Sequence, residues 1–247
     1  MVRPILVVKV GTSTLLGASE RPKDTFDYIA ESIGELRSQY DIVLVTSGAI
    51  GFGVTQLKLD IRPGSTAELQ ALSMVGQVGL LKRWRDAFGD VSIGQVLVTR
   101  RDLEASDTNH SFRDSVRALW KYGALPIVNE NDAVSSEEIT FGDNDQLAAE
   151  IAVVLGAEQL IFLTDQDGIM EDFGGPSERR LEIASIEQAQ QHIIHHKSNV
   201  GKGGGSSKLI AAQRALGAGT QVVITHAARP RAIESALTGQ SGTKLVQ

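Results

Sequence analysis

The fold is signalled by ILVVKVGTS, residues 5–13, where an apolar run passes through Lys9 into three small residues. A continuous apolar run without polar alternation is typical of a strand buried on both faces of a parallel sheet. The small residues that follow, Gly11 among them, predict a tight turn whose backbone an anion can approach closely. The stretch therefore predicts a buried strand that places a lysine beside an anion-accessible turn. The plain alternative is that Lys9 simply reaches solvent.

Similar apolar runs recur along the chain and alternate with segments of helical spacing. The runs lie at residues 42–46, 93–99, 125–128, 160–164 and 222–225, and the helical segments at residues 25–40, 67–88, 111–122, 143–155 and 206–216. This alternation predicts a doubly wound α/β fold with a mainly parallel sheet and right-handed crossovers. Ligands of such folds bind beyond the carboxyl ends of the strands. Lys9, Ser47 and Asp165 are expected at or just past such ends.

Composition and charge narrow the class of protein. Of 247 residues, 42% are hydrophobic and 22% charged, which is ordinary for a globular protein, and no linker divides the chain, so we expect one domain. The net charge of -6 argues against general nucleic-acid binding, which depends on clustered Lys and Arg. Without cysteine there is no disulfide, thiolate metal site or thiol nucleophile. We see neither a signal peptide nor an apolar stretch of about 18 residues, so we expect no membrane association and a cytoplasmic location.

A second lysine ends a glycine loop late in the chain, KGGGSSK at residues 202–208. Lys208 is expected at the start of a helix, where the helix dipole disfavours a cation unless a phosphate is bound nearby. Lys9 and Lys208, each on a small-residue loop, suit the two ends of a phosphoryl transfer, in which charge spreads over the moving group. Neither loop reads G-x-x-x-x-G-K-[ST], so the pair indicates a kinase without an ordinary P-loop. Glycines alone would equally fit a flexible loop.

Three polar segments between the lysines are candidates for binding an acceptor. Ser47 and the Gly48 amide follow a predicted strand and could hold a carboxylate, or Ser47 could simply cap the following helix. NEND, residues 129–132, could be turn chemistry, or it could grip a zwitterion with a carboxylate on its ammonium. GDND, residues 142–145, opens a helix, and we expect Asp145 to orient a lysine ammonium toward the transferring phosphate.

The remaining polar segments have weaker signals. LTDQDG, residues 163–168, could be a capped turn or a nucleotide site in which Asp165 takes a ribose or base hydrogen bond. Residues 133–141 look like a small hairpin and residues 172–180 like a polar Gly/Pro loop, and both could cover a substrate. A histidine cluster with metal-like spacing is expected to be a solvated helix end, because it lacks carboxylate partners: His192, His195 and His196.

Six landmarks, in this order, resemble the amino acid kinase family: VKVGTS (8–13), VTSGAI (45–50), GQVLVT (94–99), NENDAV (129–134), GDND (142–145) and LTD (163–165). They cover nearly the whole chain, and the NEND and GDND pair is the more specific part, because other branches of the family differ there. The resemblance implies a three-layer α-β-α sandwich with a mainly parallel central sheet. It also implies a single kinase domain over residues 1–247, with an amino-acid lobe at about 1–155 and an ATP lobe at about 156–247.

The resemblance also assigns roles to residues. Lys9 and Lys208 would stabilise the moving γ-phosphoryl group, and Asp145 would orient them. The residues implied in binding glutamate are Ser47, Gly48, Asn129, Asn131, Asp132 and Asn144. The residues implied in contacting ATP are Lys9, Gly11, Thr164, Asp165, Lys202, Gly203, Gly204, Gly205, Ser206, Ser207 and Lys208. Mg2+ would ride mostly on the phosphates, so no protein metal ligand is assigned.

The branch that is implied phosphorylates the side-chain carboxylate of L-glutamate with ATP, giving L-glutamyl 5-phosphate for proline biosynthesis. The nucleophile is already anionic at neutral pH, so no general base is needed, and two lysines with Mg2+ offset its repulsion with the triphosphate. The alternatives are a relative acting on N-acetylglutamate, aspartate, carbamate or a nucleoside monophosphate, and a catalytically weak sensor of proline or glutamate. The free amino group of glutamate is the discriminator, with Asp132 as its expected partner.

The chain departs from the family pattern in two places. Members usually carry Gly-Gly-Met-x-Thr-Lys where residues 204–208 read GGSSK, which keeps the lysine with one fewer distinctive side chain. Many members also carry a C-terminal RNA-binding-like PUA domain, whereas residues 242–245 would end the kinase domain here, so either a short form or a truncated chain is expected. The resemblance further implies feedback inhibition by L-proline and a homo-oligomer, either a dimer or a tetramer.

Overall fold

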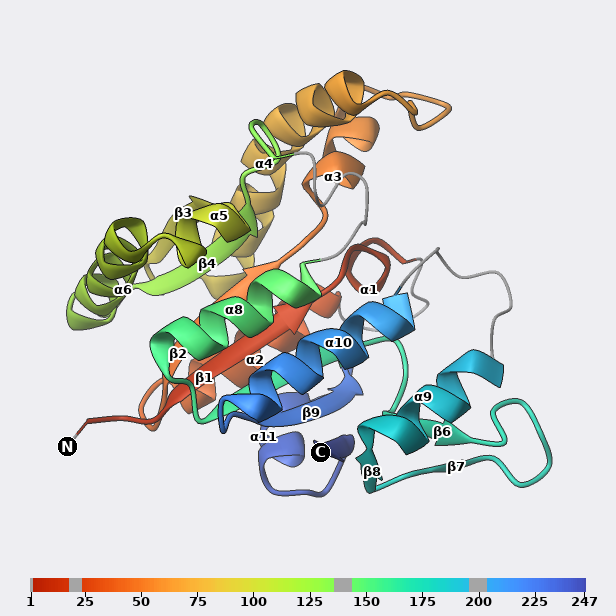
Figure 1. The fold of residues 1–247 in the computed structure, drawn as a ribbon. Helices are drawn as coiled ribbons and strands as arrows, with labels where there is room; N and C mark the ends of the chain where they lie inside the picture. Colours follow the sequence, from red (N-terminus) through yellow and green to blue (C-terminus); the bar gives the residue numbers. More distant parts are fainter. Residues whose placement is uncertain (1, 18–23, 136–143, 196–203) are drawn as a thin grey trace.

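Eight strands form the central sheet of the computed structural model, which describes residues 2–17, 24–135, 144–195 and 204–247 (Figure 1). The strands are β1 Ile5–Val10, β2 Asp41–Thr46, β3 Ile93–Val98, β4 Leu125–Glu130, β5 Gln159–Thr164, β8 Ile183–Ser185, β9 Gln221–His226 and β10 Thr243–Val246. Their spatial order is β3-β4-β2-β1-β5-β9-β10-β8. Neighbouring strands are parallel except β9 and β10, so the predicted mainly parallel sheet is confirmed.

β1 lies in the middle of the sheet, between β2 and β5, and its residues alternate between two hydrophobic cores. Val7 packs with the apolar side chains of one face, and Val8 with those of the other. Lys9 is in register with Val45 of β2 and Phe162 of β5. Because side chains alternate along a strand, Lys9 lies on the same face as Val7. The lysine is only 2% exposed, so it does not simply reach solvent.

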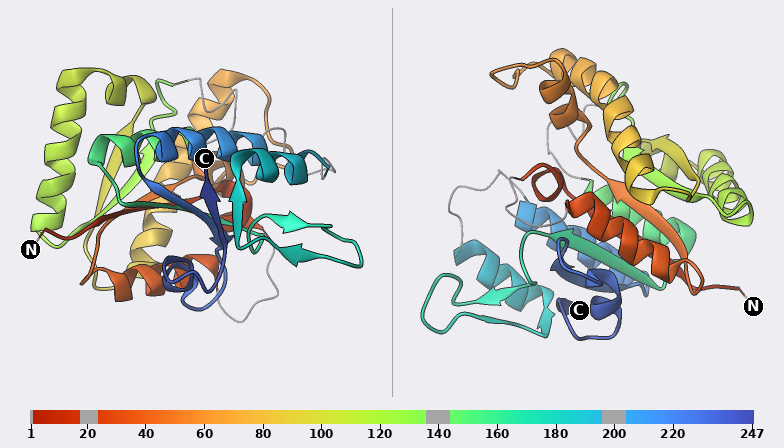
Figure 2. Two further views of the ribbon diagram at one scale, coloured as in Figure 1. Left: turned by 60° about the horizontal axis from the view of Figure 1, so that its bottom comes forward. Right: turned by 180° about the vertical axis from the view of Figure 1, so that it is seen from behind.

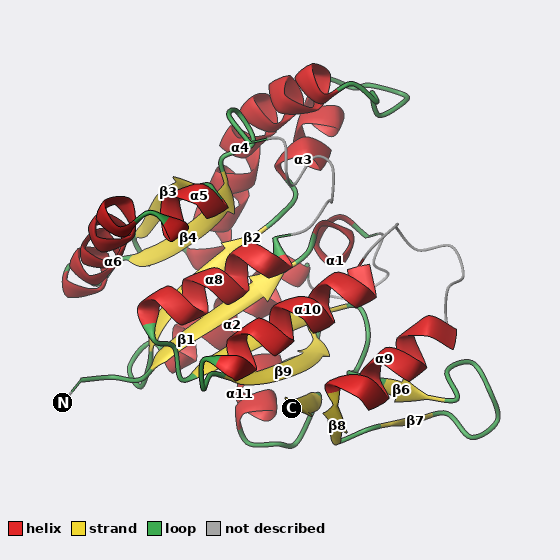
Figure 3. Ribbon diagram, in the orientation of Figure 1, coloured by secondary structure: helices red, strands yellow, loops and turns green. Residues whose placement is uncertain are grey.

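Helices cover both faces of the sheet (Figure 2, Figure 3). They are α1 Thr12–Leu16, α2 Thr25–Leu36, α3 Ala49–Gln56, α4 Thr66–Phe88, α5 Arg100–Glu104, α6 Ser106–Lys121, α8 Asp145–Leu155, α9 Ile186–His195, α10 Gly204–Gly217 and α11 Ala232–Leu237. Side chains of α6, α8 and α10 join the core on the Val7 face, and those of α2, α4 and α11 join the core on the Val8 face. The three-layer α-β-α architecture is therefore confirmed.

The long helix α4 crosses α3 at a distance that only glycine allows. A Cβ atom at Gly76 would lie 1.9 Å from the carbonyl oxygen of Ala49, and one at Gly53 would lie 2.1 Å from that of Leu72. Both distances are to backbone atoms that cannot move aside. The crossing fixes α3, and with it the turn between β2 and α3, against the 23-residue α4.

The predicted elements match the described ones, with differences at several ends. α2 ends at Leu36 rather than at Tyr40, because the chain turns at residues 37–39. α6 begins at Ser106 rather than at Ser111. The prediction missed its first five residues because residues 106–110 are polar and show no apolar spacing. α10 begins at Gly204, so the expected glycine loop partly forms the first turn of the helix.

Short strands were missed by the sequence analysis. β8 and β10 extend the sheet, and β6 Met170–Glu171 pairs with β7 Arg179–Arg180 around the predicted polar loop. The predicted hairpin at residues 133–141 lies mostly outside the described residues, and its beginning, residues 133–134, belongs to a turn. In the described parts of the chain, no helix is long and apolar enough to cross a membrane.

Candidate active site

The carboxyl ends of four parallel strands gather the predicted site residues at one edge of the sheet. β1, β2, β4 and β5 run in the same direction, and their ends carry Lys9, Ser47, Glu130 and Thr164. Parallel strands place such residues together because all their carboxyl ends face one way. The N-terminus of α8 adds Asp145, which is 0% exposed. The site is therefore built by sheet topology from segments far apart in the chain.

Lys9, Asp145 and Lys208 form an ionic cluster. The Lys9 ammonium contacts Asp145 Oδ1, and the Lys208 ammonium lies 2.9 Å from Asp145 Oδ2. The side chains of Lys9 and Asp145 are 3% and 0% exposed, and that of Lys208 is 20% exposed. One carboxylate thus holds two cations, each through its own oxygen. The two lysines that sequence reasoning singled out at opposite ends of the chain meet here.

The ionic cluster brings two cations close together at the carboxyl ends of the strands. The Lys9 and Lys208 ammonium groups share one carboxylate, and cations that converge in this way favour an anionic ligand beside them. Gly11 leaves room for such a ligand, since a Cβ atom there would lie 3.6 Å from Lys9 Nζ. The cluster is therefore suited to a phosphate group.

A second set of contacts joins Gln77, Asn129 and Asn144, and we call it the amide network. Asn144 Nδ2 donates to Asn129 Oδ1 at 2.6 Å, and Asn129 Nδ2 donates to Gln77 Oε1 at 2.8 Å. Asn144 Nδ2 also donates to the backbone oxygen of Thr46 at 2.8 Å. Asn129 and Asn144 are 2% and 1% exposed. Neutral side chains with fixed directions therefore line the site beside the ionic cluster.

The other predicted acceptor-binding residues lie at the same edge. Asp132 is 5% exposed and Ser47 is 4% exposed. Ser47 does not cap α3: Gly48 occupies the N-cap position with φ of 113°, a left-handed conformation that favours glycine, and no side chain caps it. The Asn131 backbone oxygen accepts hydrogen bonds from the amides of residues 134 and 135, so part of NEND does serve as turn chemistry.

The predicted nucleotide-binding residues fall into three groups: some lie in the turn after β5, some in α10, and some outside the described residues. Thr164 Oγ1 accepts a hydrogen bond from the Gln166 amide at 3.0 Å, which is the capped turn, and Asp165 beside it is exposed. Gly204, Gly205, Ser206 and Ser207 begin α10, so Lys208 stands in its second turn rather than at its first residue. Residues 202 and 203, Lys202 and Gly203, lie outside the described residues. So do residues 142, 143 and 196, and the side chain of His195 is not described.

Two contacts between α8 and α10 were missed by sequence reasoning. Arg214 binds Glu150 through two hydrogen bonds of 3.0 Å each, and we call this pair the helix clamp. Gln146 Nε2 also donates to the backbone oxygen of Ser207 at 3.1 Å. Residues 146 and 150 are one helical turn apart on α8, so this spacing could have indicated a common partner helix. The contacts hold the helix of Lys208 against the helix of Asp145.

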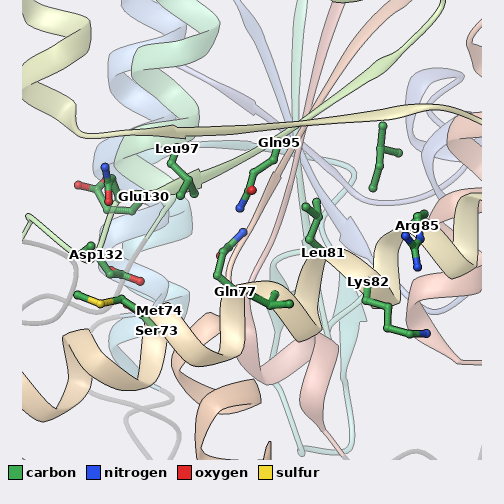
Figure 4. A pocket seen from close by; sticks show the side chains of 14 residues that line it. Ser73, Met74, Gln77, Leu81, Lys82, Arg85, Gln95, Leu97, Glu130 and Asp132 are labelled. Carbon is green, nitrogen blue, oxygen red and sulfur yellow. The ribbon is translucent and has the colours of Figure 1, made fainter.

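A cleft of about 570 Å³ lies beside the amide network, between α4, β3 and the chain that follows β4. Figure 4 shows Gln77 of α4 and Gln95 of β3 facing one another across it, with Glu130 and Asp132 at one end. Sequence reasoning did not single out Gln77. Gln77 is one of several polar residues of α4 and carries no local signal of function, and its partner Asn129 is distant in the sequence.

Comparison with known proteins identifies the class to which this fold and site belong. Residues 4–226 match the amino acid kinase family, so the chain is a member of that family. The resemblance drawn from the six sequence landmarks is thereby confirmed.

Several relatives are glutamate 5-kinases. The chain is 38% identical to the glutamate 5-kinase of Haemophilus influenzae (strain PittGG), covering 100% of this chain and 69% of that protein. It is 36% identical to the glutamate 5-kinase of Thermus thermophilus, covering 95% of this chain and 65% of the relative. The glutamate 5-kinase of Gloeobacter violaceus is 39% identical, at coverages of 97% and 67%.

Solved structures of other activities share the fold at low sequence identity. A carbamate kinase from Giardia lamblia bound to AMP-PNP superposes with a TM-score of 0.68 and 17% identity, covering 99% of this chain and 98% of the other. A UMP kinase from Ureaplasma parvum gives a TM-score of 0.63 at 13% identity, with 100% of both chains covered. These likenesses concern the architecture alone.

Proposed function

We propose that this chain transfers the γ-phosphoryl group of ATP to the side-chain carboxylate of L-glutamate, giving L-glutamyl 5-phosphate, the first step of proline biosynthesis. Membership of the amino acid kinase family and the glutamate 5-kinase relatives support this activity. The observation that carries the proposal is the ionic cluster, in which Asp145 holds Lys9 and Lys208 on separate oxygens. Two preorganised cations suit a reaction that spreads negative charge over the moving group.

The lysines act by position and charge. Asp145 directs each ammonium, so the cations need no rearrangement when charge develops in the transition state. The attacking carboxylate is anionic at neutral pH, so its nucleophilicity requires no base. Its approach to the triphosphate is opposed by like charge, which Lys9 and Lys208 reduce. We therefore propose that the acceptor and ATP lie side by side along the carboxyl ends of the strands, with the transferred phosphoryl group between them.

Mg2+ is proposed as the companion of ATP. Among the described residues, no group of three His, Asp or Glu side chains could hold a metal ion. The Lys9 and Lys208 ammonium groups would repel a metal ion that lacked phosphate ligands, so we propose that the phosphates hold most of its coordination. When bound, the ion neutralises phosphate charge beside the lysines.

The substrate-binding part of the proposal places glutamate against the amide network. Ser47 and Gly48 supply small residues at the end of β2, Asn131 follows the neighbouring strand β4, and Asp132 supplies a buried carboxylate for the ammonium. ATP is proposed to lie on the side of β5 and α10, against Gly11, Thr164, Asp165 and the loop of residues 202–208. This divides the single domain into an amino-acid lobe at residues 1–155 and an ATP lobe at residues 156–247.

Coupled measurement of ADP release across several acceptors tests the activity. We expect turnover with L-glutamate and a kcat/KM at least about 100-fold lower with N-acetylglutamate. N-acetylglutamate carries an uncharged amide in place of the ammonium that glutamate would bury in the site. Aspartate, carbamate and UMP complete the panel. Faster turnover with any of these acceptors would overturn the choice of glutamate. Binding of glutamate or proline with no ADP release from any acceptor would instead identify a sensor.

Assembly, inhibition and location are proposed from different support. β3 is an edge strand, and apolar side chains beside it are exposed, namely Met74, Val78 and Leu97. Such a face suits a homo-oligomer, a dimer or a tetramer, and light scattering of wild type against Val78→Glu tests it.

Feedback inhibition by L-proline rests on the resemblance and is tested by titrating proline into the ADP assay. A cytoplasmic location follows from the proposed substrates and is tested by fractionation.

A further inference from the structure

Asn144 has an unusual hydrogen-bond balance. Its amide nitrogen uses both hydrogens, one toward the Thr46 backbone oxygen and one toward Asn129 Oδ1. Its Oδ1 atom is buried, yet it accepts no hydrogen bond from the part of the chain that the structure describes. A buried acceptor without a donor is energetically unfavourable, so such an atom indicates a ligand that supplies the donor. An ammonium group is a donor with no acceptor of its own.

The orientation of Asn144 depends on Asn129. Asn129 Oδ1 accepts from Asn144 Nδ2 and from the Glu130 backbone amide at 2.9 Å. A flip of the Asn129 side chain would place its own NH2 group against both of these donors. Those two donors oppose the flip, and Gln77 Oε1 adds to this by accepting a hydrogen bond of 2.8 Å from Asn129 Nδ2. Gln77 is therefore the last member of a chain of three amides that ends at Asn144.

α4 also supports the other anchor of Asn144. The indole of Trp84 donates to Thr46 Oγ1 at 3.0 Å, and the backbone oxygen of Thr46 accepts from Asn144. Gln77 and Trp84 are seven residues apart, two turns of one helix, so they lie on similar sides of it. Both hydrogens of the Asn144 amide are thus held by residues that α4 contacts.

We propose that Gln77 is a positioning residue that keeps Asn144 Oδ1 presented as the acceptor for the α-ammonium of glutamate. Gln77 therefore contributes to the choice between a free amino acid and a dicarboxylate without an ammonium group. This inference rests on the proposed function. Gln77 itself touches neither acceptor nor ATP in this assignment, and it faces the cleft shown in Figure 4.

The test compares glutamate with glutarate, the same dicarboxylate without the amino group. Gln77→Met removes the acceptor at nearly unchanged side-chain volume. We expect the glutamate KM to rise about tenfold, the size of a weakened hydrogen bond to a charged group, while kcat and the KM for ATP change little. The Ki of glutarate as a competitor should stay close to that of the wild type, because glutarate makes no ammonium contact.

Gln77→Glu is the rescuing variant, since a carboxylate oxygen can still accept from Asn129 Nδ2. It should restore the ratio of glutarate Ki to glutamate KM to within about threefold of the wild type, a difference of about 0.7 kcal/mol. Gln213→Leu on the exposed face of α10 controls for loss of a glutamine far from the network. Equal weakening of glutamate and glutarate by Gln77→Met, or an unchanged ratio, would overturn the inference. A wild-type enzyme that does not phosphorylate glutamate would overturn the proposed function instead.

Discussion

The ionic cluster and the amide network meet at consecutive residues, Asp145 and Asn144, yet they hold their groups in different ways. In the described residues, the ionic cluster joins two cations through one carboxylate, so its contacts are charge-assisted. The amide network is neutral, and each of its hydrogen bonds has one allowed direction. In the proposed function, the charges of the ionic cluster therefore act on the transferred phosphoryl group, and the directed hydrogen bonds of the amide network act on the choice of acceptor.

The largest expected effect comes from removing Lys9. Lys9→Met deletes a buried cation that touches Asp145, so we expect kcat to fall about 10²–10³-fold, as when one preorganised donor is lost from an active site. The glutamate KM should change little, because the amide network remains. ADP release at saturating substrates measures the effect, and Lys244→Met, an exposed lysine on β10, is the control. Near-normal turnover would break the assignment of charge to the ionic cluster.

Lys208→Ala should cost somewhat less, about 10²-fold in kcat. Its side chain is 20% exposed, against 3% for Lys9, so water can replace more of its charge stabilisation. The KM for ATP should rise as well, since the cation stands in the second turn of α10 beside the proposed nucleotide side. Isothermal titration with a non-hydrolysable ATP analogue separates binding from turnover. A loss larger than that of Lys9→Met would reverse the ranking of the two lysines.

Asp132→Ala tests the substrate side of the comparison. We expect the glutamate KM to rise about 10–100-fold, because the ammonium loses a buried charged partner. kcat should stay within about threefold of the wild type, since this side chain touches no transferred atom in the proposed arrangement. Initial rates over a glutamate titration measure both constants. An unchanged KM would remove the argument for glutamate over acylated acceptors.

The smallest effect is expected at the helix clamp. Arg214→Met removes the two hydrogen bonds to Glu150, while the pair lies partly in solvent, so the free energy of unfolding should fall by about 0.5 kcal/mol. Contact with Glu150 raises the pKa of the Arg214 guanidinium, so the arginine stays charged over the working range of pH. We expect kcat to fall a few-fold through loosened placement of Lys208, measured beside thermal unfolding.

Arg83→Met is the matched control for the helix clamp. Arg83 joins α4 to the region of α2 through Asp27 at 2.8 Å and Asp24 at 3.0 Å, away from the ionic cluster. Its loss should lower stability by a similar amount without lowering kcat. Equal kcat losses in the two variants would show that the helix clamp has no special relation to Lys208.

The sequence predicted the ionic cluster well because each of its members has a local signal. Lys9 interrupts an apolar strand, Asp145 opens a helix, and Lys208 follows a run of glycines. Strand order then brings their segments together, as parallel α/β topology requires. The same logic located β1, β2, β4, β5 and β9 to within two residues, since these strands are apolar and six residues long.

The role of Gln77 and the pairing of Arg214 with Glu150 could not be predicted, because both depend on tertiary contacts; the spacing of residues 146 and 150 indicates only that α8 has a partner helix. Gln77 is one polar residue of an otherwise regular helix, and the sequence does not say that Asn129 faces it. β8 and β10 escaped for a different reason: three or four residues are too few to establish a period, and their pairing comes from distant strands. Ser47 was offered as a helix cap, but the backbone turns one residue later at Gly48.

The close glycine contacts between α3 and α4 fix the position of α4 beside the proposed glutamate-binding residues. Gly76 directly precedes Gln77, and its contact with the Ala49 carbonyl leaves α4 no room to slide or rotate. From that fixed point, Gln77 and Trp84 lie about 10 Å apart along the helix axis. A single residue inserted between them would rotate one of the two side chains by about 100° around the axis, away from its hydrogen-bond partner. In the proposed arrangement, the spacing of Gln77 and Trp84 along α4, and not only their chemistry, therefore determines how Asn144 is held.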